Sequence, residues 1–340
     1  SYNIFPKMKN KIKCTGWPRV DLWRKENDHL FKKETELINK KYGDFVLFSS
    51  DFGYNSLKIM NQRLNDCKNS SWVTRKQYYK EKELAEKTFK DFNYFKKLLK
   101  DYDAIKGSPL IIIRPHPGMD DKKVEGLFAD KSIFSNAKVS SKGALIDQIS
   151  ESDIIIHSGC TSAVESTLNN KVVICISPDD TYLNDYKKDT VMTKIGFSFN
   201  TPESILEFIK NLKSKKEEIQ NKIYEDKKKI AERTEIDGNS YKRISQVISE
   251  INLKKNYKTK NTDFAFKRFG NKITIKRVIK NKILKLLNIN NDNQNAFEAK
   301  FPSFDKVEIE QKIKDYNINF DINSKYKIKY LNERCIKIYN

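Results

Sequence analysis

The sequence has 340 residues, with 66 Lys and Arg against 45 Asp and Glu and a formal net charge of +21. This length suffices for two domains, and the charge favours an anionic partner, that is, an anionic substrate, an anionic membrane surface or nucleic acid. A solvated basic surface that merely reflects a Lys- and Asn-rich composition is the alternative. The sequence has no apolar run of membrane-spanning length and no signal peptide, and its five Cys form no C-x-x-C pair. We therefore expect a cytoplasmic protein without a zinc site.

The N-terminal segment contains the motif TGWPRVD. Gly16 and Pro18 predict a loop here, from which Arg19 and Asp21 project. The chain opens with Ser rather than Met, in the middle of basic sequence. We therefore expect a fragment whose upstream part is missing.

The next motif, FVLFSSDFGYN, predicts a strand over Phe45–Phe48 that runs into a polar loop. This loop contains Ser49, Asp51 and Asn55. A long helix with an apolar stripe near a 3.6-residue period is expected over 73–102.

A second strand is predicted by the apolar run in PLIIIRPHPG, residues 109–118. Its two prolines prevent a strand or helix from continuing and fix the loop. They place Arg114 and His116 at the carboxyl end of the strand. In open α/β sheets, ligands bind at this edge.

The stretch DIIIHSGCTSAVESTLN, residues 153–169, predicts a strand, a tight turn and a helix. Three consecutive Ile indicate a strand that is covered on both faces, as in a parallel sheet. Gly159 allows a sharp turn, and the N-terminus of the following helix offers N–H groups to an anion. Glu165, about one turn into the helix, is placed to accept hydrogen bonds from sugar hydroxyls. The alternative is an ordinary capped turn, in which Glu165 interacts only with the positive end of the helix.

The rest of the pattern alternates in the same way, with strands near 132–139 and 171–177 and helices near 143–149 and from Thr201 onward. This alternation is typical of the α/β class, with a Rossmann-like parallel sheet and helices on both of its faces. Because carboxyl ends of parallel strands meet at one edge, we expect the polar residues there to form one phosphate-binding crevice. These residues are Ser49, Arg114, His116 and His157.

The last part of the chain, 253–340, is dominated by Lys and Asn. Its segment 273–289 is basic and amphipathic, and it either lies on an anionic membrane surface or packs on the main domain. Short strand-like pieces occur at 326–331 and 335–339.

The motifs TGWPRVD, FSSDFGYN, IIIRPHP and SDIIIHSGCTSAVES, in this order, resemble bacterial surface-carbohydrate biosynthesis glycosyltransferases. They look like the retaining β-Kdo transferases of capsule and O-antigen assembly and, more loosely, like CMP-sugar and polyol-phosphate transferases. The resemblance covers about Lys13–Pro178. It implies a two-domain GT-B architecture, of which this chain is the C-terminal, donor-binding half. An acidic motif that such families carry before TGWPRVD is absent, which agrees with a missing N-terminal domain.

The resemblance divides the chain into an inter-domain segment (1–43), a Rossmann-like nucleotide-sugar-binding domain (44–200), C-terminal helices (201–252) and a basic extension (253–340). It implies CMP-Kdo or a related nucleotide-sugar as donor and a carbohydrate or glycolipid as acceptor. The candidate nucleotide- and substrate-binding residues are Arg19, Ser49, Asn55, Arg114, His116, His157, Ser158, Gly159, Thr161, Ser162 and Glu165. No cofactor or metal is expected, because fixed donors neutralise the phosphate.

Retention of configuration implies a carboxylate nucleophile. Asp21 is the first candidate and Asp51 the second; a structural salt bridge of Asp21 with Arg19 or Arg24 is the alternative. Two other functions stay open at this point. One is transfer of glycerol phosphate or ribitol phosphate from a CDP-polyol. The other is a non-catalytic basic module that binds nucleic acid or the anionic inner face of the membrane, although no specific nucleic-acid-binding motif accompanies the charge.

Overall fold

The computed structural model describes residues 12–24, 27, 31–50, 57–71, 73–105, 107–116, 124–126, 136–141, 143–176, 190–250, 305–319, 327–332 and 335–339. The chain divides into two compact units, Ser1–Val247 and Ile248–Asn340. The first unit contains the predicted sheet, so the segment before the sheet and the helices after it belong to the same unit as the sheet.

The first unit is built on a six-stranded sheet in which every neighbouring pair is parallel. Its strands are β1 (Phe45–Ser50), β2 (Leu110–Pro115), β3 (Ala137–Val139), β4 (Ile154–His157), β5 (Val172–Ile176) and β6 (Phe197–Phe199). The spatial order is β3-β2-β1-β4-β5-β6, which is the order of the Rossmann fold. The chain runs outward from β1 to β3 and then returns to place β4 beside β1. This reversal creates a switch point between β1 and β4, and the α/β class predicted from sequence is confirmed.

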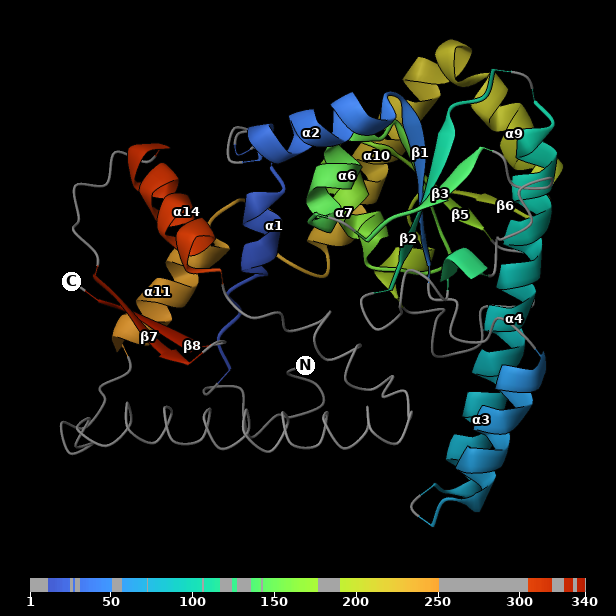
Figure 1. Ribbon diagram of the computed structural model, residues 1–340, viewed down its shortest axis with the longest axis horizontal. Helices are drawn as coiled ribbons and strands as arrows, with labels where there is room; N and C mark the ends of the chain where they lie inside the picture. Colours follow the sequence, from blue (N-terminus) through green and yellow to red (C-terminus); the bar gives the residue numbers. More distant parts are fainter. Residues whose placement is uncertain are drawn as a thin grey trace, which may run out of the picture. The chain divides into compact units, whose positions relative to one another are not determined.

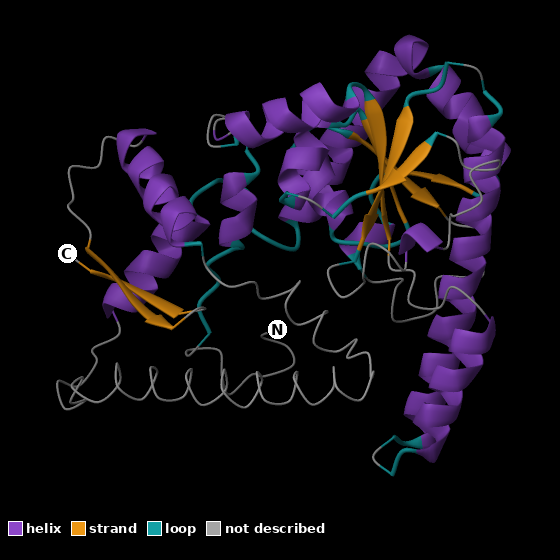
Figure 2. Cartoon of the chain, viewed as in Figure 1, coloured by secondary structure: helices purple, strands orange, loops and turns teal. Residues whose placement is uncertain are grey.

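Helices cover both faces of the sheet (Figures 1 and 2). In chain order, the described helices of the first unit are α1 (Pro18–Leu22), α2 (Lys32–Tyr42), α3 (Leu57–Asn69), α4 (Arg75–Asp103), α6 (Leu145–Glu151), α7 (Ser162–Leu168), the 3-10 turn η4 (Val191–Thr193), α9 (Pro202–Lys210), the 3-10 turn η5 (Leu212–Lys215), α10 (Lys216–Ala231) and α11 (Ser240–Glu250).

One face of the sheet is covered by α4 and α9. Side chains alternate along a strand, so Val46 and Phe48 of β1 point to this face. There they belong to a buried cluster with Phe95 of α4 and Ile205 of α9. Thr201 caps α9 by accepting a hydrogen bond from Ser204 N, and Pro202 occupies its first turn, as the sequence predicted.

The other face is covered by α2, α6, α7 and α10. Phe45 and Leu47 of β1 point to this side and pack against Ile149 of α6. Further along the sheet, Val173 of β5 packs with Ile230 of α10. Burial on both faces explains why the strands are apolar throughout rather than alternating.

Only the C-terminal half of the long helix α4 packs into the hydrophobic core. Phe92 and Phe95, from its C-terminal half, are buried against the sheet, whereas Tyr79 and Leu84 are 49% and 38% exposed. The N-terminal half pairs with α3 through a small cluster around Leu64 and extends past the sheet (Figure 1). The stripe predicted from periodicity is therefore a core stripe only where the helix crosses the sheet.

The N-terminal motif differs from its prediction. Pro18–Leu22 forms the short helix α1, with Pro18 in its first turn, instead of a loop. Asp21 does not project, because it is only 5% exposed. Pro in the first turn costs no hydrogen bond, and the apolar Val20 and Trp23 bury this helix against Ile146 of α6.

The described part of the second unit contains α14 (Lys306–Asn319) and the antiparallel pair β7 (Lys327–Asn332) and β8 (Cys335–Tyr339). The two strands agree with the strand-like pieces predicted near the C-terminus. The amphipathic segment 273–289 lies outside the described residues. Within the described ranges, no helix is both long and apolar enough to cross a bilayer.

Truncation of Phe95 is expected to destabilise the first unit strongly. The side chain is fully buried and stacks on Phe48 of the sheet, so Phe95→Ala leaves a cavity and lowers the free energy of unfolding by about 3–5 kcal/mol. Urea denaturation measures this. Asn93→Ala, an exposed position on the same helix, is the control and should change it by less than about 0.5 kcal/mol.

Candidate functional site

The carboxyl edge of the sheet brings three predicted residues side by side. In the strand register, Ser49 of β1 lies between Arg114 of β2 and His157 of β4. Cys175 of β5 lies beyond His157. His116 follows β2 directly and is exposed. The prediction that these residues share one edge is confirmed, and the edge lies at the β1/β4 switch point, where open α/β sheets bind ligands.

His157 is fully buried and organises the turn that follows it. Its Nδ1 accepts hydrogen bonds from the backbone N–H groups of Gly159 and Cys160, at 3.0 and 3.3 Å. Gly159 has φ +85°, a conformation that suits glycine. Because Nδ1 accepts, the proton of the neutral ring is on Nε2.

These hydrogen bonds restrict the anion site that was expected at the turn. The N–H groups of Gly159 and Cys160 point to the imidazole, and those of Ala163 and Val164 close the first turn of α7 on the carbonyls of Cys160 and Thr161. The turn itself forms as predicted, with Ser158 half-buried and Thr161 exposed at the start of α7. A phosphate at this edge therefore depends more on side chains than on this backbone.

Arg114 is held at the edge by the loop that follows β3. Its Nη2 donates a hydrogen bond of 2.9 Å to the carbonyl of Gly143. Gly143 itself has φ +79°. This contact was not predicted, because nothing in the sequence links the two positions. It orients a guanidinium, which has five N–H donors, toward the edge of the sheet.

Glu165 is the most perturbed acidic group at this edge. It is 1% exposed, and its Oε1 lies 3.4 Å from Nη2 of Arg19. Burial raises the pKa of Glu165 to about 7, although the positive charges of Arg19 and Arg114 act in the opposite direction. A carboxyl that titrates near neutrality is typical of a functional site.

Two buried polar atoms on α7 find no hydrogen-bond partner among the described residues: Oε2 of Glu165 and Oγ of Ser162. The two residues are three apart and share a face of the helix. Leaving such atoms unsatisfied costs free energy.

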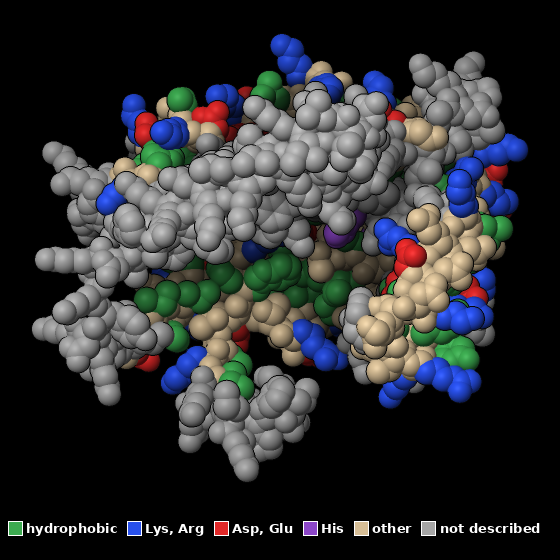
Figure 3. All heavy atoms as spheres, turned by 60° about the horizontal axis from the view of Figure 1, so that its bottom comes forward, with side chains coloured by type: hydrophobic (Ala, Val, Ile, Leu, Met, Phe, Trp, Pro, Cys, Tyr) green, Lys and Arg blue, Asp and Glu red, His purple; other side chains and the backbone are tan. Residues whose placement is uncertain are grey.

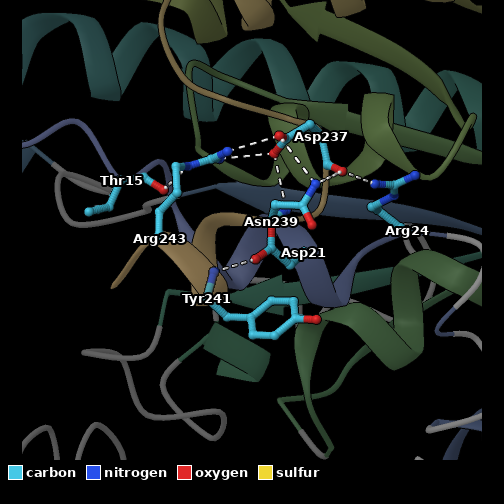
Figure 4. Close-up of polar contacts among 7 residues, drawn as sticks. All are labelled: Thr15, Asp21, Arg24, Asp237, Asn239, Tyr241 and Arg243. Atoms are coloured by element: carbon cyan, nitrogen blue, oxygen red, sulfur yellow. Dashed lines mark hydrogen bonds and ion pairs between the residues drawn. The ribbon is translucent and has the colours of Figure 1, made fainter. Parts of the chain in front are cut away.

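Asp21 makes a different contact from the one considered on sequence grounds. Its Oδ2 accepts a 2.9 Å hydrogen bond from the backbone N–H of Tyr241, at the start of α11 (Figure 4). Its partner is thus neither Arg19 nor Arg24. Arg19 contacts Glu165 and lies over the ring of Trp23, with 5.1 Å from Cζ to the ring centroid. The catalytic role of Asp21 stays a prediction.

Asp51 and Asn55 lie outside the described residues. The structure adds Cys160 to the residues at this edge, because its Sγ lies 3.7 Å from Oγ of Ser49. No pattern in the sequence pointed to this cysteine. Within the described ranges, no cluster of three His, Cys, Asp or Glu side chains is suited to hold a metal ion.

No protein-family model matches the chain, and no curated protein matches it. Among solved structures, the wall teichoic acid polymerase TagF is similar with a TM-score of 0.40 and 14% identity, over 69% of this chain and 50% of TagF. A TagF variant gives 0.42 and 14%, over 70% and 51%. A glycosyltransferase from Rickettsia africae ESF-5 gives 0.35 and 14%, over 64% and 52%. This chain spans about half the length of these structures.

Glu165→Gln is expected to flatten the pH dependence of stability. The folded-state pKa of Glu165 lies above the usual value of 4.5, so the folded state binds the proton more tightly. The contribution of Glu165 to the free energy of unfolding is therefore fully present below about pH 4.5, decreases as pH rises and becomes constant above about pH 7. The variant should match the wild type at pH 4 and exceed its free energy of unfolding by up to about 3 kcal/mol at pH 8.

Urea denaturation of both proteins across this pH range measures the difference. Taking the difference cancels the other titrating groups. A variant that is equally destabilised at pH 4 and pH 8 would contradict the raised pKa of Glu165.

Proposed function

We propose that this chain is the donor-binding part of a glycosyltransferase that moves a sugar, Kdo in the first instance, from a CMP-activated donor to a surface-polysaccharide or glycolipid acceptor. The observation that carries the proposal is the alignment of Arg114, Ser49 and His157 at the switch point of the parallel sheet. Nucleotides bind at such points in Rossmann-like folds.

Arg114 and His116 supply the charge that this proposal needs. Both follow the apolar part of β2, where the phosphate of a nucleotide would lie at the carboxyl edge. Arg114 is already oriented by its hydrogen bond to Gly143. A guanidinium binds phosphate through charge-assisted hydrogen bonds, and the same contact stabilises CMP as it leaves. His157 acts indirectly, by shaping the turn after β4.

Glu165 and Ser162 are proposed to bind the ribose. Their Oε2 and Oγ atoms are buried and lack partners among the described residues, so ribose hydroxyls would restore the missing hydrogen bonds. Arg19 and Arg114 both act on Glu165 electrostatically. The positive charges of these arginines offset the repulsion between the Glu165 carboxylate and a nearby phosphate.

The chemical step requires a carboxylate if configuration is retained. Asp21 and Asp51 are the two candidates from sequence. No metal is needed in this scheme, since fixed cationic side chains neutralise the developing phosphate charge. A donor that carries cytidine diphosphate and a polyol would use the same phosphate and ribose contacts, so donor choice is decided by experiment.

Arg114→Ala is expected to weaken CMP binding about 10- to 100-fold, because a charge-assisted hydrogen bond to phosphate is lost. Isothermal titration calorimetry measures the Kd. The control is Arg75→Ala, which removes the same charge from the exposed start of α4, beyond the part of this helix that packs on the sheet. Equal losses in both variants would indicate that only net charge matters and would remove Arg114 from the phosphate site.

A donor panel tests the reaction class. With CMP-Kdo and CDP-glycerol supplied separately, we expect CMP release from CMP-Kdo, detected by a coupled nucleotide assay, and little turnover of CDP-glycerol. If CDP-glycerol is the better donor, the proposed reaction is instead polyol-phosphate transfer.

Binding of duplex DNA tighter than that of CMP, with a steep dependence on salt, would favour a basic module instead. Lys and Arg are spread over the face shown in Figure 3 rather than gathered in one patch of its described residues.

A further inference from the structure

The short helix α1 makes polar contacts with two distant parts of the first unit. Arg19 contacts Glu165 of α7, in the proposed nucleotide site. Asp21 contacts the backbone N–H of Tyr241, at the N-terminus of α11. Successive helical residues are rotated by about 100°, so side chains two apart point to nearly opposite sides. One side of α1 thus meets the site, and the other meets α11.

The contact between Asp21 and Tyr241 is part of a larger polar cluster, which we call the clasp (Figure 4). The clasp consists of the contacts that join Thr15, Asp21 and Arg24, before the sheet, to Asp237, Tyr241 and Arg243, before and within α11. Arg243 donates to both carboxylate oxygens of Asp237, at 2.8 and 2.9 Å, and to the carbonyl of Thr15 at 3.0 Å. Arg24 donates to the carbonyl of Asp237. The Arg243 guanidinium and the Asn239 N–H hold the pKa of Asp237 well below its usual range.

The backbone of the N-terminal segment approaches α11 closely. Gly16 has φ +82°, and a Cβ atom at this position would overlap Oγ of Ser240. Ser240 is fully buried. Only glycine fits here, which indicates that the two segments are packed together rather than merely adjacent.

We propose that Asp21 is a positioning residue, which fastens α1 to the N-terminus of α11 and thereby sets Arg19 against Glu165. Asp21 caps α11 from outside the helix, and a carboxylate there also interacts favourably with the positive end of the helix. Val20 and Trp23 anchor α1 through apolar contacts. Asp21 restricts the rotation of α1 about its axis, and this rotation determines the direction in which Arg19 points.

This role differs from that of a nucleophile. One oxygen of Asp21 is committed to the backbone N–H of Tyr241. Of the two carboxylates predicted from sequence, Asp51 then remains the candidate nucleophile. Asn separates the two roles for Asp21, since its amide oxygen can accept from Tyr241 N–H but its side chain cannot attack a sugar.

The first experiment does not depend on the proposed function. The carboxyl of Glu165 is titrated by ¹³C NMR in the full chain, with Glu165→Gln identifying its signal. Arg19 lowers the pKa of Glu165, so Asp21→Ala, by releasing Arg19, should raise it further by about one unit. Asp21→Asn should restore the wild-type titration. An unchanged titration in Asp21→Ala would overturn the proposal.

The second experiment rests on the proposed function. Asp21→Ala should weaken CMP binding and slow donor turnover about five- to tenfold, and Asp21→Asn should rescue both. A loss of turnover of a thousandfold or more in Asp21→Asn, with CMP affinity intact, would overturn the proposal and make Asp21 the nucleophile. If Asp21→Ala fails to fold, Asp21→Glu replaces it, because the extra methylene displaces α1 while the charge at α11 is kept.

The two experiments separate the two proposals. If the wild type does not bind CMP, the proposed function fails, but the titration of Glu165 still tests whether Asp21 positions Arg19. If CMP binds and the pKa of Glu165 is the same in Asp21→Ala as in the wild type, the positioning role fails and the proposed function stands.

Discussion

Parallel pairing of β1 with both β2 and β4 is the constraint on which the site depends. Residues in register across parallel strands end at the same level, so the polar residues that follow three apolar runs are brought to one edge. Phe48 and Leu47 are buried in separate clusters on opposite faces, so a slip of one residue would exchange the side chains that the two clusters receive. The hydrophobic core and the placement of Arg114 beside Ser49 and His157 are thus consequences of the same pairing.

The proposed site combines cationic and acidic groups, and the charge of each would be unfavourable there without the other. Glu165 is buried where an ionised carboxylate is costly, and Arg19 and Arg114 offset part of this cost. The balance leaves the pKa of Glu165 at about 7. Small changes in the position of either arginine therefore change the charge of the site, which makes the placement of α1 important for chemistry at the sheet edge.

Sequence reasoning predicted the sheet and its edge because these depend on local signals. Each signal lies within ten residues of the chain: Ile111–Ile113 precede Pro115 and Pro117, and Ile154–Ile156 precede Ser158 and Gly159. It did not predict the contact of Arg19 with Glu165, the contact of Arg114 with Gly143 or the capping of α11 by Asp21, which join residues 29 to 220 positions apart. It also assigned a loop to Pro18–Leu22, because Gly16 and Pro18 suggest a turn and the burial of Val20 and Trp23 is decided by α6.

The clasp joins the beginning of the first unit to its end, and this has a consequence for the order in which the unit is completed. During synthesis, both faces of the sheet can be covered once α10 has emerged, but α1 lacks its partner until Tyr241 has been made. The sheet and its carboxyl edge can therefore exist before Arg19 has its final direction. A nascent chain that stops short of α11 lacks the contacts that Tyr241 and Arg243 make in the clasp, so that assembly of the sheet and placement of α1 are separate steps.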